Sequence, residues 1–142
     1  MQYSNRKLEN KSKRINLDIK LKNIDAVEGL PFHNNHFDAV YSHMFYNMSF
    51  TDEELKFLFN ESKRVLKNKL LSFSVRNDKD IMYRKGTEVT ENIYDINDFQ
   101  IRFFTKQDIE LFMKDKFEIL KIIEDYEEPA TLYFVICYKN EN

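Results

Sequence analysis

Apolar and polar residues alternate over residues 15–22 of this chain. Polar residues separate four aliphatic ones, Ile15, Leu17, Ile19 and Leu21. A period of two residues predicts a β-strand with one buried face, and the polar positions indicate that the other face is exposed. Residues 1–14, which come before this segment, are polar and basic and show no apolar period. They indicate a basic arm or a short helix.

Two helices are marked by capping boxes. Thr51 is followed by Glu54, and Thr105 is followed by Asp108. At this spacing each hydroxyl can accept a hydrogen bond from the backbone amide three residues further on, while the carboxylate reaches back. Apolar residues then recur along one face of each helix. The sequence therefore predicts helices that begin at these two threonines, the first ending near Lys67.

Short apolar runs predict the remaining strands. They lie at 37–41, 70–75, 117–123 and 131–138. The connections between elements are a loop over 24–35, one helical turn over 44–50 and a long polar loop over 76–100. The last run is continuously apolar, so we expect it inside the sheet, between 70–75 and 117–123. The order of elements predicts an α/β fold with a mostly parallel sheet and a C-terminal antiparallel hairpin.

The composition excludes several classes of function and of binding site. The chain has 142 residues, the size of one domain, and its formal charge of −2 argues against a generally basic nucleic-acid binder. A single cysteine, Cys137, excludes an internal disulfide and a multi-cysteine zinc site, and we expect it in the core. Only two glycines occur, Gly29 and Gly86, which excludes a glycine-rich phosphate loop. No run of about 18 apolar residues and no signal-peptide core is present, so we expect a cytoplasmic protein without a membrane partner.

Three segments carry a resemblance to a known family. They are IDAVEGLPF at 24–32 followed by FDAVYS at 37–42, ESKRVLK at 61–67 leading into the next strand, and the closing hairpin. In this order they resemble the class I S-adenosylmethionine-dependent methyltransferases, of the small-molecule, tellurite-resistance-like type (type 11). The resemblance covers residues 15–139. It implies a Rossmann-like fold and transfer of a methyl group from S-adenosylmethionine to a small molecule.

The resemblance also implies site residues. Asp25 would accept a hydrogen bond from the adenine amino group, and the Ala26 amide would contact an adenine ring nitrogen. Tyr41 and Ser42 would bind cofactor at the carboxyl end of their strand, where open α/β sheets bind ligands, and His43 is the candidate general base. Four residues of the long polar segment would form aromatic walls and anion clamps for the substrate, unless they are solvated loop residues: Tyr83, Arg84, Tyr94 and Arg102. His33 and His36 have an H-x-x-H spacing, which we assign to an ordinary turn, and no metal site is expected.

The chain departs from the family at its glycines. No glycine precedes Gly29, so the G-x-G-x-G motif that grips the methionine and ribose end of the cofactor is missing. We therefore expect a single truncated methyltransferase-like domain over 1–142, with 1–14 as a flexible basic arm, that binds S-adenosylmethionine weakly or not at all. Strand 15–22 would pair with 37–41, or a homodimer or another partner would complete the sheet. The function is either that of a methyltransferase, which we expect to be inactive as an isolated chain, or that of a non-catalytic relic or interaction module that binds no cofactor.

Overall fold

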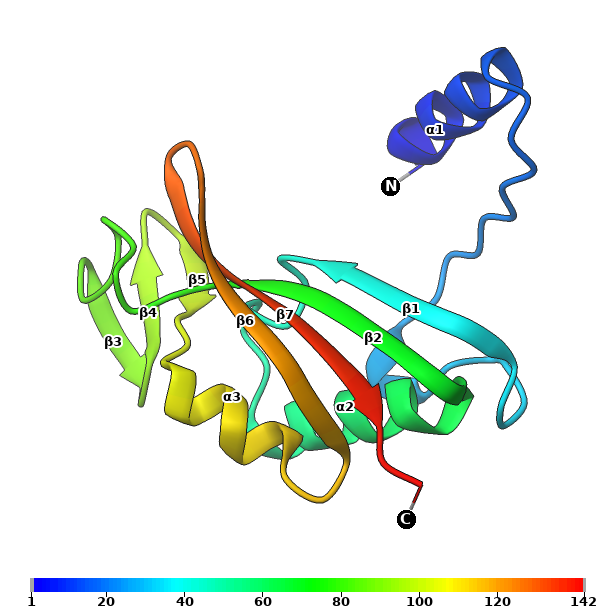
Figure 1. Cartoon of the computed structure of the whole chain (residues 1–142). Coiled ribbons are helices and arrows are strands. Elements are labelled where there is room, and N and C mark those ends of the chain that lie inside the picture. Colours follow the sequence, from blue (N-terminus) through cyan, green and yellow to red (C-terminus); the bar gives the residue numbers. More distant parts are fainter. Residues whose placement is uncertain (1, 142) are drawn as a thin grey trace. The chain divides into compact units, whose positions relative to one another are not determined.

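The computed structural model describes residues 2–141, which divide into two compact units between Leu30 and Pro31. In the first unit, helix α1 spans Gln2–Arg14 and a one-turn 3-10 helix, η1, spans Ala26–Glu28 (Figure 1). The Asp25 carboxylate caps η1 by accepting a hydrogen bond from the Val27 amide at 3.2 Å. Residues 1–14 were predicted as an arm or a short helix, and the described part of that segment is helical.

The predicted strand at 15–22 is wrong. The segment has no regular secondary structure, and it pairs with no strand among the described residues. Ile15 and Leu17 are 56% and 54% exposed, so the apolar face that the pattern predicted is not buried. A strand needs a hydrogen-bonded neighbour as well as an alternating pattern, and the pattern alone carries no information about that neighbour.

The second unit is built on a four-stranded sheet with the order β1-β2-β7-β6. Its strands are β1 (Phe37–His43), β2 (Leu66–Arg76), β6 (Phe117–Glu127) and β7 (Ala130–Lys139). β1 runs parallel to β2, whereas β2–β7 and β7–β6 are antiparallel. All four strands were predicted, and each is longer than its apolar run. β7 lies between β2 and β6 as expected, and the final hairpin is confirmed.

Helices α2 (Asp52–Val65) and α3 (Lys106–Met113) lie on one face of this sheet (Figure 1). Both capping boxes are present, with each threonine hydroxyl accepting from the amide three residues on at 3.1 Å. The core between helices and sheet is aromatic: Phe59 and Phe73 are buried with ring centroids 5.4 Å apart. No described helix is long and apolar enough to span a membrane.

A second, smaller sheet occupies the region that the sequence predicted as a long loop. Its antiparallel strands are β3 (Thr87–Thr90), β4 (Ile93–Ile96) and β5 (Phe99–Arg102), in the order β3-β4-β5. The turn between β4 and β5 consists of Asn97 and Asp98, both with positive φ, which is a hairpin signal that the sequence did contain. Gly86 precedes the sheet with a φ of +72°, and a Cβ there would lie 2.0 Å from the Asp95 carbonyl oxygen. Segment 44–50 forms an isolated hydrogen-bonded turn and no helix.

Candidate functional site

A chain of three polar side chains crosses the carboxyl end of the parallel strand pair. His43 ends β1 and lies opposite Ser74 of β2 in the strand register. The His43 Nδ1 is 2.7 Å from the Ser74 Oγ, and that oxygen also accepts a hydrogen bond from the Met44 amide at 3.2 Å. On the other side of the ring, the His43 Nε2 lies 3.3 Å from the Glu127 Oε2 at the end of β6. The imidazole is therefore held at both nitrogens while its side chain stays 41% exposed.

A groove of about 500 Å³ begins at Met44, the residue that follows His43. The segment after β1 forms one wall with Met44, Asn47 and Met48, and the turn and start of β5 form another with residues 98–101. Arg76, the last residue of β2, contributes to the same lining. Carboxyl ends of parallel strands are where open α/β sheets bind ligands, so the groove lies where a substrate is expected.

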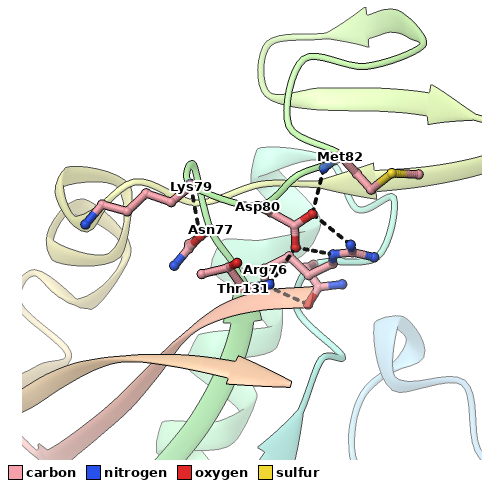
Figure 2. A network of polar contacts seen from close by, with 7 residues as sticks. Arg76, Asn77, Lys79, Asp80, Met82 and Thr131 are labelled. Carbon is pink, nitrogen blue, oxygen red and sulfur yellow. Dashed lines mark hydrogen bonds and ion pairs between the residues drawn. The ribbon is translucent and has the colours of Figure 1, made fainter. Parts of the chain in front are cut away.

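A second polar network fixes the loop that leaves β2 (Figure 2). The Asp80 carboxylate accepts hydrogen bonds from the Arg76 guanidinium at 2.8 and 2.9 Å and from the Met82 and Thr131 amides, both at 2.9 Å. The Asp80 side chain is fully buried and that of Arg76 is 12% exposed. Burial alone would raise the pKa of Asp80, but the hydrogen bonds outweigh it and lower the pKa. The network ties the β2–β3 loop to β7 and stabilises one wall of the site.

The predicted cofactor-binding residues fall in both units. Asp25 is exposed and Ala26 is half-buried, and they form the capped turn η1 of the first unit. Tyr41 and Ser42 lie in β1 of the second unit, where Tyr41 is 66% exposed. The Ser42 hydroxyl is buried and has no hydrogen-bond partner among the described residues. Buried polar groups are normally hydrogen-bonded, so this hydroxyl calls for an explanation.

The structure brings three of the four predicted substrate residues together. The rings of Tyr83 and Tyr94 lie 5.9 Å apart, and the Arg84 guanidinium lies 5.1 Å from the centre of the Tyr83 ring. Burial raises the pKa of Tyr94, which belongs to the small core of the second sheet together with Ile96 and Phe103. Tyr83 packs against that core. Their substrate role remains a prediction.

Arg102, the fourth predicted substrate residue, is buried at the end of β5. Its Nη2 donates to the Phe50 carbonyl at 3.0 Å and to the Asp52 carboxylate at 2.8 Å, while its Nε is buried without a partner among the described residues. Together with Asp52 and Glu91, it lines two hollows of about 370 and 330 Å³. Arg102 thus holds the start of α2 against the small sheet.

The remaining two histidines lie in a loop, and the cysteine lies in the core. His33 and His36 contact each other, with 2.7 Å between the His33 Nε2 and the His36 Nδ1, on the loop before β1. No group of three or more His, Cys, Asp or Glu side chains that could hold a metal occurs within residues 2–141. Cys137 is buried in β7, and burial raises the pKa of its thiol to about 12. Its placement agrees with the core position that the sequence predicted.

Sequence reasoning missed Ser74, Asp80 and Glu127. Ser74 left a signal, because the apolar run of β2 is interrupted by serine at every second position, Ser72 and Ser74. That alternation marks one face of the strand as polar. Asp80 and Glu127 gave no such signal, since their partners come from other elements and depend on how the chain folds.

Comparison with known proteins finds a related family for the first part of the chain. Residues 1–69 match the family model described as a methyltransferase domain. Among solved structures, the PH0226 protein from Pyrococcus horikoshii is 19% identical with a TM-score of 0.74, covering 95% of this chain and 66% of its own. The first part of the chain is therefore similar in sequence to a methyltransferase domain, and the chain has the fold of that class of protein. No curated protein matches it.

Two further methyltransferase structures confirm the fold. A S-adenosylmethionine-dependent methyltransferase from Clostridium acetobutylicum is 16% identical, with a TM-score of 0.76 and coverage of 99% of this chain and 72% of its own. One from Methanosarcina mazei is 19% identical, with a TM-score of 0.70 and coverage of 87% and 67%. The chain spans about two thirds of the length of these structural neighbours.

In the first unit, Asp25 fits the adenosyl end of S-adenosylmethionine. The Asp25 carboxylate is exposed and one of its oxygens is oriented by the Val27 amide. A carboxylate has about four acceptor positions, so it can also accept from an exocyclic amine. In the second unit, taken by itself, the Ser42 hydroxyl has no partner among the described residues, and a bound ligand would satisfy it.

Proposed function

We propose that this chain is a methyltransferase domain that binds S-adenosylmethionine and acts on a small molecule. The observation that supports it most is the carboxyl end of β1. The buried Ser42 hydroxyl there lacks a partner among the described residues, and Met44, the residue after the exposed His43, lines a groove of about 500 Å³. A ligand can satisfy the Ser42 hydroxyl. The family resemblance adds Asp25 and Ala26 as contacts to adenine.

When bound, S-adenosylmethionine supplies a methyl group on a sulfonium that is already activated. The protein therefore has mainly to bind and orient the two reactants. Asp25 would accept from the adenine amine, the Ala26 amide would donate to a ring nitrogen, and Tyr41 and Ser42 would contact the cofactor at the carboxyl end of β1. His43 would face the acceptor molecule in the groove.

An NMR titration of the chain with S-adenosylhomocysteine tests this function. We expect weak binding, because the chain has no glycine before Gly29 to form the family's glycine-rich turn. Asp25→Ala removes a hydrogen bond to a charged group, worth about 1.5–3 kcal/mol, so binding should weaken by at least about tenfold. Asp18→Ala, a change of another exposed aspartate in the same unit, is the matched control. Failure of the native chain to bind would reject the proposal, as would equal affinities of the two variants.

A second candidate function is favoured by the edge of β1. β1 pairs with β2, and no strand within the described residues pairs with its other side. An open edge presents unpaired amides and carbonyls that can accept another strand. We propose as the alternative that the chain is an interaction module whose sheet is completed by a partner. The most readily available strand is segment 15–22 of a second copy, which has the alternating pattern and exposed aliphatic side chains.

Light scattering at several concentrations tests this alternative. A homodimer that forms with increasing concentration would support it. Leu17→Lys, on the apolar side of the segment, should weaken the dimer, whereas Asn16→Lys on the polar side should not. A single species near 17.3 kDa at every concentration would contradict self-association.

A further inference from the structure

The contacts of His43 identify both the proton acceptor of the site and the chemical class of its substrate. We propose that Glu127, oriented by His43 and Ser74, accepts a proton from a substrate amine that arrives as an ammonium ion. The proposal rests on the proposed methyltransferase function, since a protonated amine has no lone pair and must lose a proton before it can be methylated.

The two partners of the His43 ring determine which of its nitrogens carries hydrogen. The Ser74 Oγ accepts from the Met44 amide at 3.2 Å, and towards the His43 Nδ1, 2.7 Å away, it can either donate its hydrogen or accept a second hydrogen bond. The Glu127 carboxylate can only accept, so Nε2 of a neutral ring carries the hydrogen and Nδ1 accepts from Ser74. That hydrogen faces the Glu127 Oε2, at an Nε2–Oε2 distance of 3.3 Å.

This arrangement changes the role of His43. With Ser74 at one nitrogen and Glu127 at the other, the neutral imidazole has no unoccupied lone pair for a substrate proton. The proton-accepting group at the surface is then Glu127, whose side chain is 61% exposed. Ser74 is only 2% exposed, which excludes it as a nucleophile. We therefore assign His43 and Ser74 as positioning residues.

The charge of this corner favours a cation. Glu127 follows Asp125 and precedes Glu128 in the hairpin that joins β6 to β7. The nearby Lys79 is already paired with Glu124. A carboxylate in such surroundings attracts an ammonium ion and repels a phenolate or a carboxylate. One N–H proton then moves from the ammonium to a Glu127 oxygen, which leaves a neutral amine with its lone pair and a neutral carboxylic acid.

The tautomer of His43 gives the first test, by long-range ¹H–¹⁵N NMR of the imidazole rings. We expect hydrogen on Nε2 of His43 in the native chain. Ser74→Ala should redistribute the tautomers, and Ser74→Thr, which keeps the hydroxyl, should restore the native pattern. His33 and His36 serve as internal controls because they do not contact Ser74. A native His43 with its hydrogen on Nδ1 would overturn the assignment.

Selectivity for an amine gives the second test, with benzylamine as the probe and benzyl alcohol and benzoate as its neutral and anionic counterparts. Binding is followed by the shift of the His43 ring signals. We expect benzylamine to bind most tightly, and Glu127→Gln to weaken it by about tenfold, as for the loss of one charge-assisted contact. Glu128→Gln is the matched control and should change the affinity much less. Equal binding of the three probes, or equal effects of the two variants, would overturn the proposal.

These outcomes are separable from the fate of the proposed function. If S-adenosylhomocysteine fails to bind but benzylamine binding depends on Glu127, the methyltransferase function is wrong and the amine site stands. If S-adenosylhomocysteine binds in an Asp25-dependent way but the amine shows no preference, the function stands and the amine assignment is wrong.

Discussion

Two polar clusters lie near the carboxyl ends of β1 and β2 and differ in how much water reaches them. In the Asp80 network the carboxylate is fully buried and four N–H groups donate to it. In the Ser74–His43–Glu127 chain the two ionisable side chains are 41% and 61% exposed. A buried, fully paired cluster maintains the shape of the loop around it, whereas an exposed cluster can exchange protons and partners. The difference separates residues that build the site from residues that act in it.

Removal of the Asp80 side chain should give the largest loss of stability in this comparison. Asp80→Ala leaves the Arg76 guanidinium, 12% exposed, without its partner. Breaking a buried ion pair from one side costs about 3–5 kcal/mol, so the free energy of unfolding in urea should fall by that amount. Glu127→Ala breaks an exposed contact and should change it by about 0.5 kcal/mol or less. Similar losses for the two variants would show that burial does not distinguish the clusters.

Acid gives a second test of the buried cluster. The pKa of Asp80 is lowered on folding, because hydrogen bonds from Arg76 and two backbone amides outweigh the effect of burial. Its contribution to stability is therefore complete above the ordinary aspartate pKa of about 3.9 and is lost as the pH falls through the lower folded value. In unfolding experiments across this range, Asp80→Asn should lose stability less steeply with falling pH than the native chain. An unchanged slope would contradict the assigned shift.

The sequence predicts elements that depend on residues close together in the chain, and it fails for elements that depend on residues far apart. Both helices were predicted from Thr51 and Thr105, because a capping box lies within four residues. The strands of the main sheet were predicted where burial follows from an apolar run, as in β7. The strand at 15–22 failed because alternation cannot supply a pairing partner. The small sheet was missed because its four-residue strands are shorter than the pattern needs.

The candidate site shows the same division. His43 was found because it follows a strand that the sequence predicts, and β-sheet topology then places it at the ligand-binding edge. Its partners come from β2 and β6, so only the fold brings Ser74 and Glu127 to it. Asp25 was found by resemblance, and the structure adds that it caps a turn.

Removing a group that is hydrogen-bonded but exposed should lower the free energy of unfolding by an amount between the effects of Asp80→Ala and Glu127→Ala. The Thr51 hydroxyl accepts from the Glu54 amide at 3.1 Å and begins α2. Thr51→Ala should lower the free energy of unfolding by about 1 kcal/mol, as for the loss of an N-cap. Thr90→Ala, in the exposed strand β3, is the control and should have a smaller effect. A loss at Thr51 as large as that of Asp80→Ala would contradict the ranking.

A group that is buried but unpaired should have the smallest effect on stability and a distinct effect on binding. Removing the Ser42 hydroxyl by Ser42→Ala deletes a polar atom that has no partner among the described residues, so the free energy of unfolding should change by about 0.5 kcal/mol or less. Ser62→Ala is the matched control, because the Ser62 hydroxyl is buried and hydrogen-bonded to the Tyr46 hydroxyl at 2.7 Å. Burial raises the pKa of Tyr46 to about 12, so its phenol stays neutral. Ser62→Ala removes the hydrogen bond to this phenol and should lower the free energy of unfolding by about 1–2 kcal/mol.

If Ser42 contacts the cofactor, Ser42→Ala should also weaken binding of S-adenosylhomocysteine while Ser62→Ala leaves it unchanged. The reverse order of the two stability losses would show that the Ser42 hydroxyl is satisfied within the folded chain and is not held available for a ligand.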